Sequence, residues 1–358
     1  MDISKQEDIK SKRSIGMFKG NGGIIIKVVI GGLFLLRLTI TQDSIKSNTF
    51  CFAIEVPNES LYTSGACIIQ TNDNGFAIVG YIEPFRYERD VYVIKIDKTG
   101  NLQWTRRIGG KGDDVGNSII QTKDGGFAIT GYTDSFGQGY HDVYVIKLDR
   151  SGNLQWSKTI GGFSTDEGNS IIQTTDSGFA IVGYTCSFPP GFCNVYIIKL
   201  DATGNLQWAK AIGSGTDSYG YSIVQTNDGG FVIAGYTKSV KWVEPAHCVY
   251  CCFSVPNCIA TLGQGDADVY VIKLDNIGNV QWTKTIGGIT WNYGHSIVQT
   301  HDKGFVIAGF TQSFLGGEED IYIIKLNKNG RLQWIKTIGG IYSDEGYFII
   351  QTKDSGLV

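Results

Sequence analysis

The chain has 358 residues, of which 48 are glycine and only six are proline, and 31 Lys and Arg against 34 Asp and Glu leave a formal net charge of −3. No basic run lies outside the N-terminus, so the charge pattern excludes the polyanion-binding footprint of a nucleic-acid-binding protein. Glycines concentrated at turns, with no segment of helical periodicity, indicate an all-β protein built from many short strands.

The N-terminal segment, residues 1–44, has the pattern of a targeting segment. It begins with a polar, basic stretch, and residues 24–40 are apolar except for Lys27 and Arg37. The longest uncharged stretch, 28–36, is too short to span a bilayer but fits the apolar core of an export signal. We therefore expect an exported protein. The alternatives are membrane attachment through an uncleaved anchor, a buried N-terminal strand and a cytoplasmic protein.

From residue 66 onwards, after a linker at 45–65 with one degenerate strand, the chain repeats one unit about every 52 residues. A Gln-Thr pair marks each copy, at Gln70, Gln121, Gln173, Gln225, Gln299 and Gln351. The copies span residues 66–116, 117–168, 169–220, 221–294, 295–346 and, in part, 347–358. A fixed period of this size is typical of a propeller blade or a solenoid turn.

Within the second copy, four segments predict strands, at residues 117–122, 127–133, 143–148 and 154–160. Glycine-containing turns at Gly125 and Gly152 separate the first from the second and the third from the fourth. The third strand carries apolar or aromatic residues on both faces, so both faces need burial. The fourth strand alternates, with Leu154, Trp156 and Ile160 on one face and polar residues on the other, which predicts a half-exposed strand.

Four antiparallel strands per copy, with the outermost half exposed, predict a β-propeller blade. A β-helix would have shorter coils and parallel strands, which the tight hairpin turns oppose. We therefore predict an all-β propeller of five complete blades and part of a sixth. An unclosed ring leaves strand edges exposed. Either residues 50–56 and the C-terminal strand make a reduced closing blade, or the chain is truncated and the ring incomplete, which we expect.

The segment at residues 147–156, KLDRSGNLQW, resembles the blade ends of pyrroloquinoline-quinone-type propellers. A closer resemblance, over residues 66–358, is to mostly uncharacterised secreted or lipoprotein-like prokaryotic propeller proteins, which share the motifs SIxQTxDGGF, GYTxSFG and DxYxIKLD. That resemblance implies the fold and an exported location. The quinoprotein resemblance implies a quinone over the central channel beside calcium and an acidic base. The vicinal pair Cys251-Cys252 lies in an insertion, so we carry no cofactor site over.

Each complete copy has one tryptophan in its fourth strand. Large rings at a repeated position of a half-exposed strand are expected to pack at the interface between blades. We therefore assign a structural role to Trp104, Trp156, Trp208, Trp282 and Trp334.

Acidic residues recur in the loops that join the second strand to the third and the fourth strand to the next copy. These loops share one face of a propeller, so two rings of acidic positions are expected there. Carboxylates are ligands for calcium, and the candidates are Asp114, Asp142, Asp166, Asp268, Asp320 and Asp344. The alternative is that each aspartate accepts hydrogen bonds from its own loop. Repetition in every copy favours the alternative, and no other cofactor is predicted.

The fourth copy contains an insertion, residues 241–262, between its second and third strands. Six of the eight cysteines are expected on one face, in this insertion and in the equivalent loop of the preceding copy, at Cys186, Cys193, Cys248, Cys251, Cys252 and Cys258. In an exported protein these cysteines predict disulfides, which would hold in place loops that have no hydrophobic core of their own. Cys186 and Cys193 flank one loop and are the expected first bridge. Zinc bound through His247, Cys248, Cys251 and Cys258 is the alternative.

Aromatic residues of the same insertion are candidates for a partner-binding surface, at Trp242, Tyr250 and Phe253. Rings on a rigid scaffold loop act as anchors in many interfaces, but they could equally cover the blade beneath. The chain has no nucleophile-elbow motif and its four histidines are dispersed.

The function we predict is a secreted or cell-surface, non-catalytic binding scaffold whose loop-rich face binds a protein or a glycan. Two alternatives stay open. One is an enzyme, either a quinoprotein-like oxidoreductase or a carbohydrate-active propeller that uses two loop carboxylates. The other is a truncated gene product.

Overall fold

The computed structural model describes residues 16–20, 23–30, 34–40, 49–50, 62–85, 88–188, 191–238, 266–313, 319–352 and 354–358. Within these ranges the regular secondary structure consists of strands alone. The chain is therefore all-β, as the sequence predicts.

Five antiparallel sheets correspond to the five complete copies. The first contains β4 (Thr49–Phe50), β5 (Tyr62–Gln70), β6 (Phe76–Phe85), β7 (Glu88–Ile96) and β8 (Leu102–Ile108). The second contains β9 (Asp114–Gln121), β10 (Phe127–Thr133), β11 (Asp142–Leu148) and β12 (Leu154–Ile160). The third contains β13 (Asp166–Gln173), β14 (Phe179–Thr185), β15 (Asn194–Leu200) and β16 (Leu206–Ile212).

The last two sheets repeat the pattern. The fourth contains β17 (Ser218–Gln225), β18 (Phe231–Lys238), β19 (Ala267–Leu274) and β20 (Val280–Ile286). The fifth contains β21 (Asn292–Gln299), β22 (Phe305–Thr311), β23 (Asp320–Leu326) and β24 (Leu332–Ile338). The sixth copy contributes residues 347–358, where Gln351 pairs with Leu357 in an isolated antiparallel bridge.

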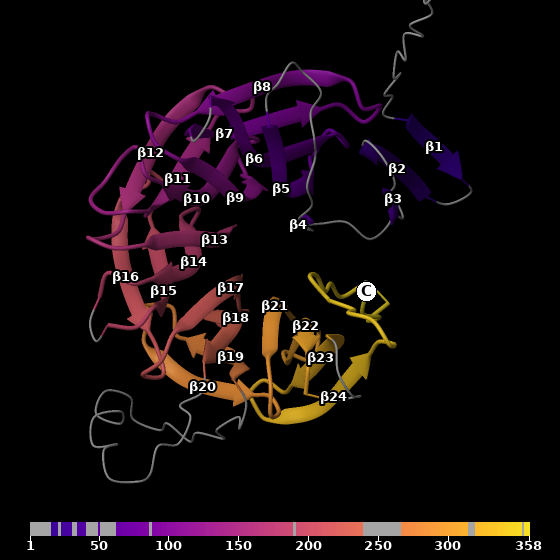
Figure 1. Cartoon of the computed structure of the whole chain (residues 1–358), viewed down its shortest axis with the longest axis vertical. Helices are drawn as coiled ribbons and strands as arrows, with labels where there is room; N and C mark the ends of the chain where they lie inside the picture. Colours follow the sequence, from indigo (N-terminus) through magenta and orange to yellow (C-terminus); the bar gives the residue numbers. More distant parts are fainter. Residues whose placement is uncertain are drawn as a thin grey trace, which may run out of the picture.

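The five sheets follow one another around a common centre in chain order (Figure 1). The strands β5, β9, β13, β17 and β21 lie towards the centre, with β4 inside β5, and the outermost strands are β8, β12, β16, β20 and β24. This propeller-like arrangement places the second and third strands between neighbouring sheets. All seven residues of β11 and of β15 are buried, so the third strands of the second and third sheets are covered on both faces as predicted. The fourth strand β12 is largely exposed, which also agrees with the sequence.

The predicted alternation of the fourth strand is wrong at its first residue. Lys147 pairs with Trp156, but the next residue, Leu148, pairs with Leu154, because a bulge shifts the register between β11 and β12. The extra residue reverses which side of the strand faces the core. Leu154, expected on the buried face with Trp156, is 53% exposed.

A second bulge lies in every first strand. In β9, Gly116 pairs with Gly131 and Ser118 with Thr130, so Asn117 has no partner across the pair. β9 also begins at Asp114, three residues before the predicted start at 117. The bulge brings the two backbones so close that a β-carbon on Gly131 would lie 1.8 Å from the carbonyl oxygen of Val115. Glycine is therefore required at this position of the second strand.

Four of the five predicted tryptophans, all but Trp334, pack against the next sheet. The ring of Trp104 meets Phe127 of β10 edge-on at a centroid distance of 5.6 Å, and Trp156 meets Phe179 of β14 at 5.7 Å. Trp208 with Phe231 and Trp282 with Phe305 repeat the contact. These pairs contribute about 0.5–1.5 kcal/mol each beyond area burial.

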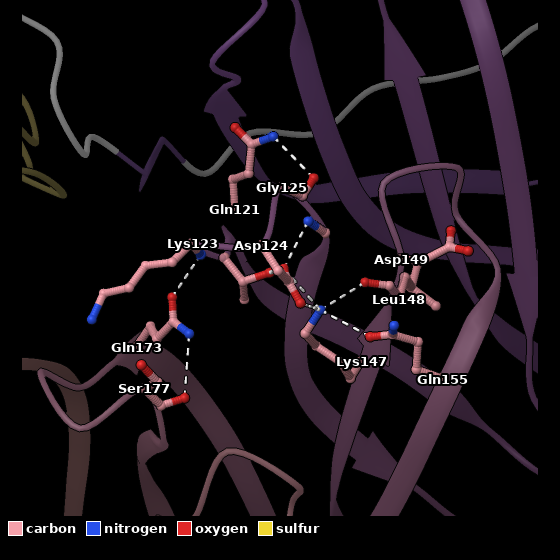
Figure 2. Close-up of polar contacts among 12 residues, drawn as sticks. Gln121, Lys123, Asp124, Gly125, Lys147, Leu148, Asp149, Gln155, Gln173 and Ser177 are labelled. Carbon is pink, nitrogen blue, oxygen red and sulfur yellow. Dashed lines mark hydrogen bonds and ion pairs between the residues drawn. The ribbon is translucent and has the colours of Figure 1, made fainter.

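One end of the sheets, which we call the lower face, carries the turns after the first and third strands. Figure 2 shows that the repeated glutamine joins neighbouring sheets there. The Gln173 side chain accepts from the backbone N–H of Lys123 in the preceding sheet (2.8 Å) and donates to the carbonyl of Ser177 in its own turn (3.3 Å). Equivalent inter-sheet bonds involve Gln121, Gln225, Gln299 and Gln351.

The N-terminal segment contains β1 (Gly16–Gly20), β2 (Gly23–Ile30) and β3 (Phe34–Ile40), which form a separate antiparallel sheet. Among the described residues no helix is long and apolar enough to cross a membrane. The export signal stays a prediction. β4 pairs with β5 on the inner side of the first sheet.

Candidate functional site at the upper end of the channel

The upper face, at the opposite end of the sheets, carries the loops after the second and fourth strands. Thr133, the last residue of β10, pairs with Asp142 on one side and with Asp114 on the other. The two predicted rings of acidic positions therefore lie at the same end of the sheets.

The aspartates of these rings accept hydrogen bonds from their own loops. Asp114 Oδ2 accepts from the N–H of Gly110 (2.8 Å) and the hydroxyl of Ser135 (2.6 Å). Asp166 repeats both contacts, with Gly162 (2.7 Å) and Ser187 (2.6 Å). Burial raises the pKa of Asp114 above its ordinary value. These contacts are those of turn-fixing side chains.

The remaining calcium candidates lie in comparable places. Asp142 accepts from the N–H of Gln138 (2.6 Å), and Asp344 accepts from that of Gly340 (3.0 Å). Asp268 lies 3.4 Å from the amide nitrogen of Asn292, and Asp320 is buried at the start of β23. Across the described ranges no group of three or more His, Cys, Asp or Glu side chains is arranged to hold a metal ion.

A histidine with two carboxylates joins the second and third sheets at this end. His141 Nδ1 lies 2.8 Å from Glu167 Oε1 and its Nε2 lies 3.4 Å from Asp134 Oδ1, while its ring stacks on Tyr132. The hydrogen bond to Glu167 raises the pKa of His141. The sequence alone suggested only a dispersed loop histidine.

Beside Glu167 begins a row of tyrosines, which we call the tyrosine row, formed by Tyr184, Tyr219, Tyr236 and Tyr293. Ring centroids lie 4.7 Å apart between Tyr184 and Tyr219, 4.9 Å between Tyr219 and Tyr236, and 4.0 Å between Tyr236 and Tyr293. Burial raises the pKa of all four hydroxyls, so each stays protonated at neutral pH.

Below the tyrosine row a cavity of about 560 Å³ lies among the first strands of the second to fifth sheets and the first residues of the sixth copy. Tyr221, His295 and Tyr347 line it. The His295 ring lies 5.3 Å from that of Tyr221 and 5.1 Å from that of Tyr347. Burial lowers the pKa of His295 to about 4, so the imidazole is neutral at pH 7. The cavity has the size of a small-molecule site.

Sequence reasoning missed the tyrosine row and the cavity lining. The signal was present in the repeats, because the second residue of the first strand changes from copy to copy while the glycine after it does not. That second residue is Val115, Glu167, Tyr219, Tyr293 or Glu345. A position that differs between copies of a rigid scaffold is where one site can be distinguished from its repeats.

Exposed aromatic side chains also gather on the upper loops of the second and third sheets. Tyr140 is 75% exposed and Phe163 is 84% exposed, and they belong to adjacent loops, since the position of Gly139 lies against Gly162 and Phe163. Phe136 is exposed in the loop of Tyr140, and Phe188 and Phe192 are exposed in the loop between β14 and β15.

The predicted Cys186–Cys193 disulfide is present in the structure and closes the loop that carries Phe188 and Phe192. The remaining predicted cysteines, Cys248, Cys251, Cys252 and Cys258, lie outside the described residues, as do His247, Trp242, Tyr250 and Phe253. The zinc alternative and the partner-binding role of the insertion stay predictions.

Replacing both Cys186 and Cys193 by serine is expected to destabilise the protein by about 2–3 kcal/mol, because the unfolded chain regains the freedom of a short closed loop. Urea unfolding of the double variant against the wild-type protein measures this. An unchanged midpoint would show that the bridge does not contribute to the folded state.

No protein-family model matches the chain. The curated regulatory protein FlaEY of Caulobacter vibrioides is 26% identical over 122 residues, and the match covers 30% of this chain and 13% of that protein. The chain thus matches a small part of that relative's length.

Two solved structures are similar to this chain at low sequence identity. A protein of unknown function from Dyadobacter fermentans has a TM-score of 0.48 and 11% identity, covering 81% of this chain and 84% of that one. An endo-1,5-α-L-arabinanase from Thermotoga petrophila has a TM-score of 0.39 and 13% identity, covering 84% of this chain and 77% of that one. Similarities at this level do not assign the activity of either neighbour to this chain.

Proposed function

We propose that the protein is an extracellular β-propeller of five complete blades that binds a partner through its upper face without catalysis. The observation that carries the proposal is the group of exposed rings on the upper loops, led by Tyr140 and Phe163. Aromatic anchors on loops of a rigid scaffold are typical of binding surfaces.

The loops that present these rings are held in place, which lowers the entropy cost of binding. The disulfide closes the loop of Phe188 and Phe192. The N–H of Asp166 donates to the carbonyl of His141 (2.8 Å) and that of Cys186 to the carbonyl of Thr165 (2.8 Å), so the loops of adjacent sheets are tied together. A disulfide also supports an oxidising, extracellular compartment.

Two carboxylates of the upper face favour binding over catalysis. A general acid or base must have a carboxyl group available to the substrate, whereas Asp114 and Asp166 are buried and accept hydrogen bonds from their loops. The oxidoreductase and carbohydrate-active enzyme alternatives stay untested predictions.

The proposal is tested by selecting ligands for the wild-type protein from a printed glycan array and from a displayed random-peptide library. The double variant Tyr140→Ser/Phe163→Ser is expected to lose at least about tenfold in affinity for the selected ligand, since truncated anchors cost more than 1 kcal/mol. Leu154→Ser is the matched control, because Leu154 is an exposed apolar residue at the lower end. Failure of both libraries, or an equal loss in the control, would overturn the proposal.

A further inference from the structure

We infer that the cavity below the tyrosine row binds a neutral, polyhydroxylated ligand, namely a short oligosaccharide or the uncharged end of one. The inference rests on the proposed function, since it names the ligand class that the upper end of the channel admits. It is carried by the chemistry of the cavity lining and of the rim above it.

The cavity lining is neutral. Its residues are Ser, Asn, Gln, Tyr, Phe, Ile, Val and His, and none of those that the structure describes around the cavity is Asp, Glu, Lys or Arg. Charged residues make up 18% of the chain. An ionic ligand would meet no counter-charge here and would lose its hydration, which costs far more than burying a hydroxyl with a partner.

The polar groups of the lining are oriented in advance. The hydroxyl oxygen of Ser222 accepts from the N–H of Ile297 (3.2 Å), and that of Ser296 accepts from the N–H of Ile349 (3.2 Å). Each hydroxyl keeps its proton for donation. The Asn169 amide donates to the carbonyl of Gly220 (2.9 Å) and keeps its oxygen as an acceptor. Fixed donors and acceptors together suit a ligand whose hydroxyl groups both donate and accept hydrogen bonds.

The upper part of the cavity adds aromatic surface. Tyr221 and Tyr347 line the cavity on either side of His295, and Tyr221 continues into the tyrosine row through Tyr236 at 5.8 Å. An aromatic ring offers a large apolar face next to a polar hydroxyl. A sugar ring, with C–H groups on its faces and hydroxyls on its edge, matches both parts of such a surface.

Three charged pairs lie on the upper loops, and the hydroxyl of Tyr347 donates to the carboxylate of Glu345. Arg89 lies 3.8 Å from Asp113, Lys238 lies 2.8 Å from Asp217, and Glu167 accepts from His141 at 2.8 Å. A charged ligand would have to break one of these ion pairs before it could form an ion pair with the protein. The upper loops therefore favour a neutral ligand over an anionic one.

The test is isothermal titration of the full chain with maltotriose, cellotriose and arabinotriose, and with trigalacturonate as a charged probe of similar size. At least one neutral probe is expected to bind, at least about tenfold more tightly than trigalacturonate. Tyr347→Ser is expected to weaken that binding at least about tenfold. Tyr342→Ser is the matched control, because Tyr342 is 73% exposed nearby but does not line the cavity.

A second pair of variants keeps the test decisive if Tyr347→Ser fails to fold. Asn169→Ala removes a cavity acceptor and is expected to weaken binding about tenfold, as the loss of one hydrogen bond to the ligand would. Asn117→Ala loses the equivalent structural bond, to Gly168 at 3.0 Å, but Asn117 does not line the cavity. It is expected to bind normally.

Three results would overturn the inference: no neutral probe binds, trigalacturonate binds equally well, or the control variants lose as much affinity for the neutral probe as the cavity variants do. The proposed function would still stand in each case if the selected partner needs Tyr140 and Phe163. Conversely, sugar binding in the Tyr140→Ser/Phe163→Ser variant would support the cavity independently of the exposed loops.

Discussion

Gly183→Ala is expected to destabilise the protein by about 3 kcal/mol, the upper end of typical overpacking costs. A β-carbon at Gly183 would lie 1.7 Å from the carbonyl oxygen of Glu167 and 3.0 Å from the α-carbon of Gly168. Both are backbone atoms of the bulged strand β13, and the pairing of Gly168 with Gly183 fixes their position. No rotamer change relieves the overlap, so the two strands must separate.

Gly340→Ala is the control for this prediction. Gly340 lies in an upper loop, and the nearest atom to its added β-carbon would be the Asp344 carboxylate at 3.9 Å, which is an ordinary contact. Its unfolding free energy is expected to change by less than about 0.5 kcal/mol. Urea unfolding of both variants measures the difference, and equal effects would contradict the bulge as the reason for glycine in the second strands.

Asp124→Asn is expected to destabilise the protein by about 3 kcal/mol, because it leaves a buried ammonium group without its carboxylate. Lys147 lies in β11 with its side chain only 5% exposed, and its Nζ lies 2.9 Å from Asp124 Oδ2 (Figure 2). The ammonium also donates to the carbonyl of Leu148 (3.0 Å) and to the Gln155 side chain (3.1 Å). Those neutral acceptors do not replace the charge.

Lys147→Met is the informative partner variant. It removes the buried charge, keeps most of the apolar stem, and leaves the half-exposed Asp124 to water, so it is expected to cost about 1 kcal/mol. The measurement is the difference in unfolding free energy between the two variants. If Lys147→Met were the more damaging change, the pair would be stabilising through packing of the lysine stem and not through the charge.

The same pair predicts a dependence on pH. Burial raises the pKa of Asp124, but hydrogen bonds from Thr122 and Lys147 outweigh it and hold the pKa at about 2. Because this value lies below the ordinary 3.8, the contribution of Asp124 to stability is complete above about pH 4 and is lost as the pH falls towards 2. The Asp124→Asn variant should lose this part of the acid sensitivity.

Local chemistry explains why most strands could be predicted. The turn glycines Gly125 and Gly152 adopt φ values of 82° and 79°, which glycine accepts without strain, and they fix where the flanking strands end. The predicted strand 127–133 agrees with β10 residue for residue. Leu154 was assigned to the wrong face because the bulge that turns it outward depends on its partner strand β11.

The candidate site could not be predicted in the same way. Glu167, Tyr219 and Tyr293 stand one or more repeats apart in the sequence. Tyr219 pairs with Tyr236 within one sheet, but only the fan of sheets brings Tyr293 to Tyr236 and Tyr219 to Tyr184. The repeat made these residues hard to recognise. A position that varies between copies is interpreted as one that tolerates substitution, until its neighbours across the channel are known.

The sequence by itself determined the strands, their order and the end of the sheets at which each loop lies, because turn residues and the period-two alternation act within a few residues of the chain. It also identified Cys186 and Cys193 as the first bridge, since they flank one loop and lie seven positions apart. The tertiary structure alone decided the bulges, the tyrosine row and the neutral cavity. The bulges depend on the register between strands of one sheet, and the tyrosine row and the cavity depend on distances between strands of different copies, which no local pattern encodes.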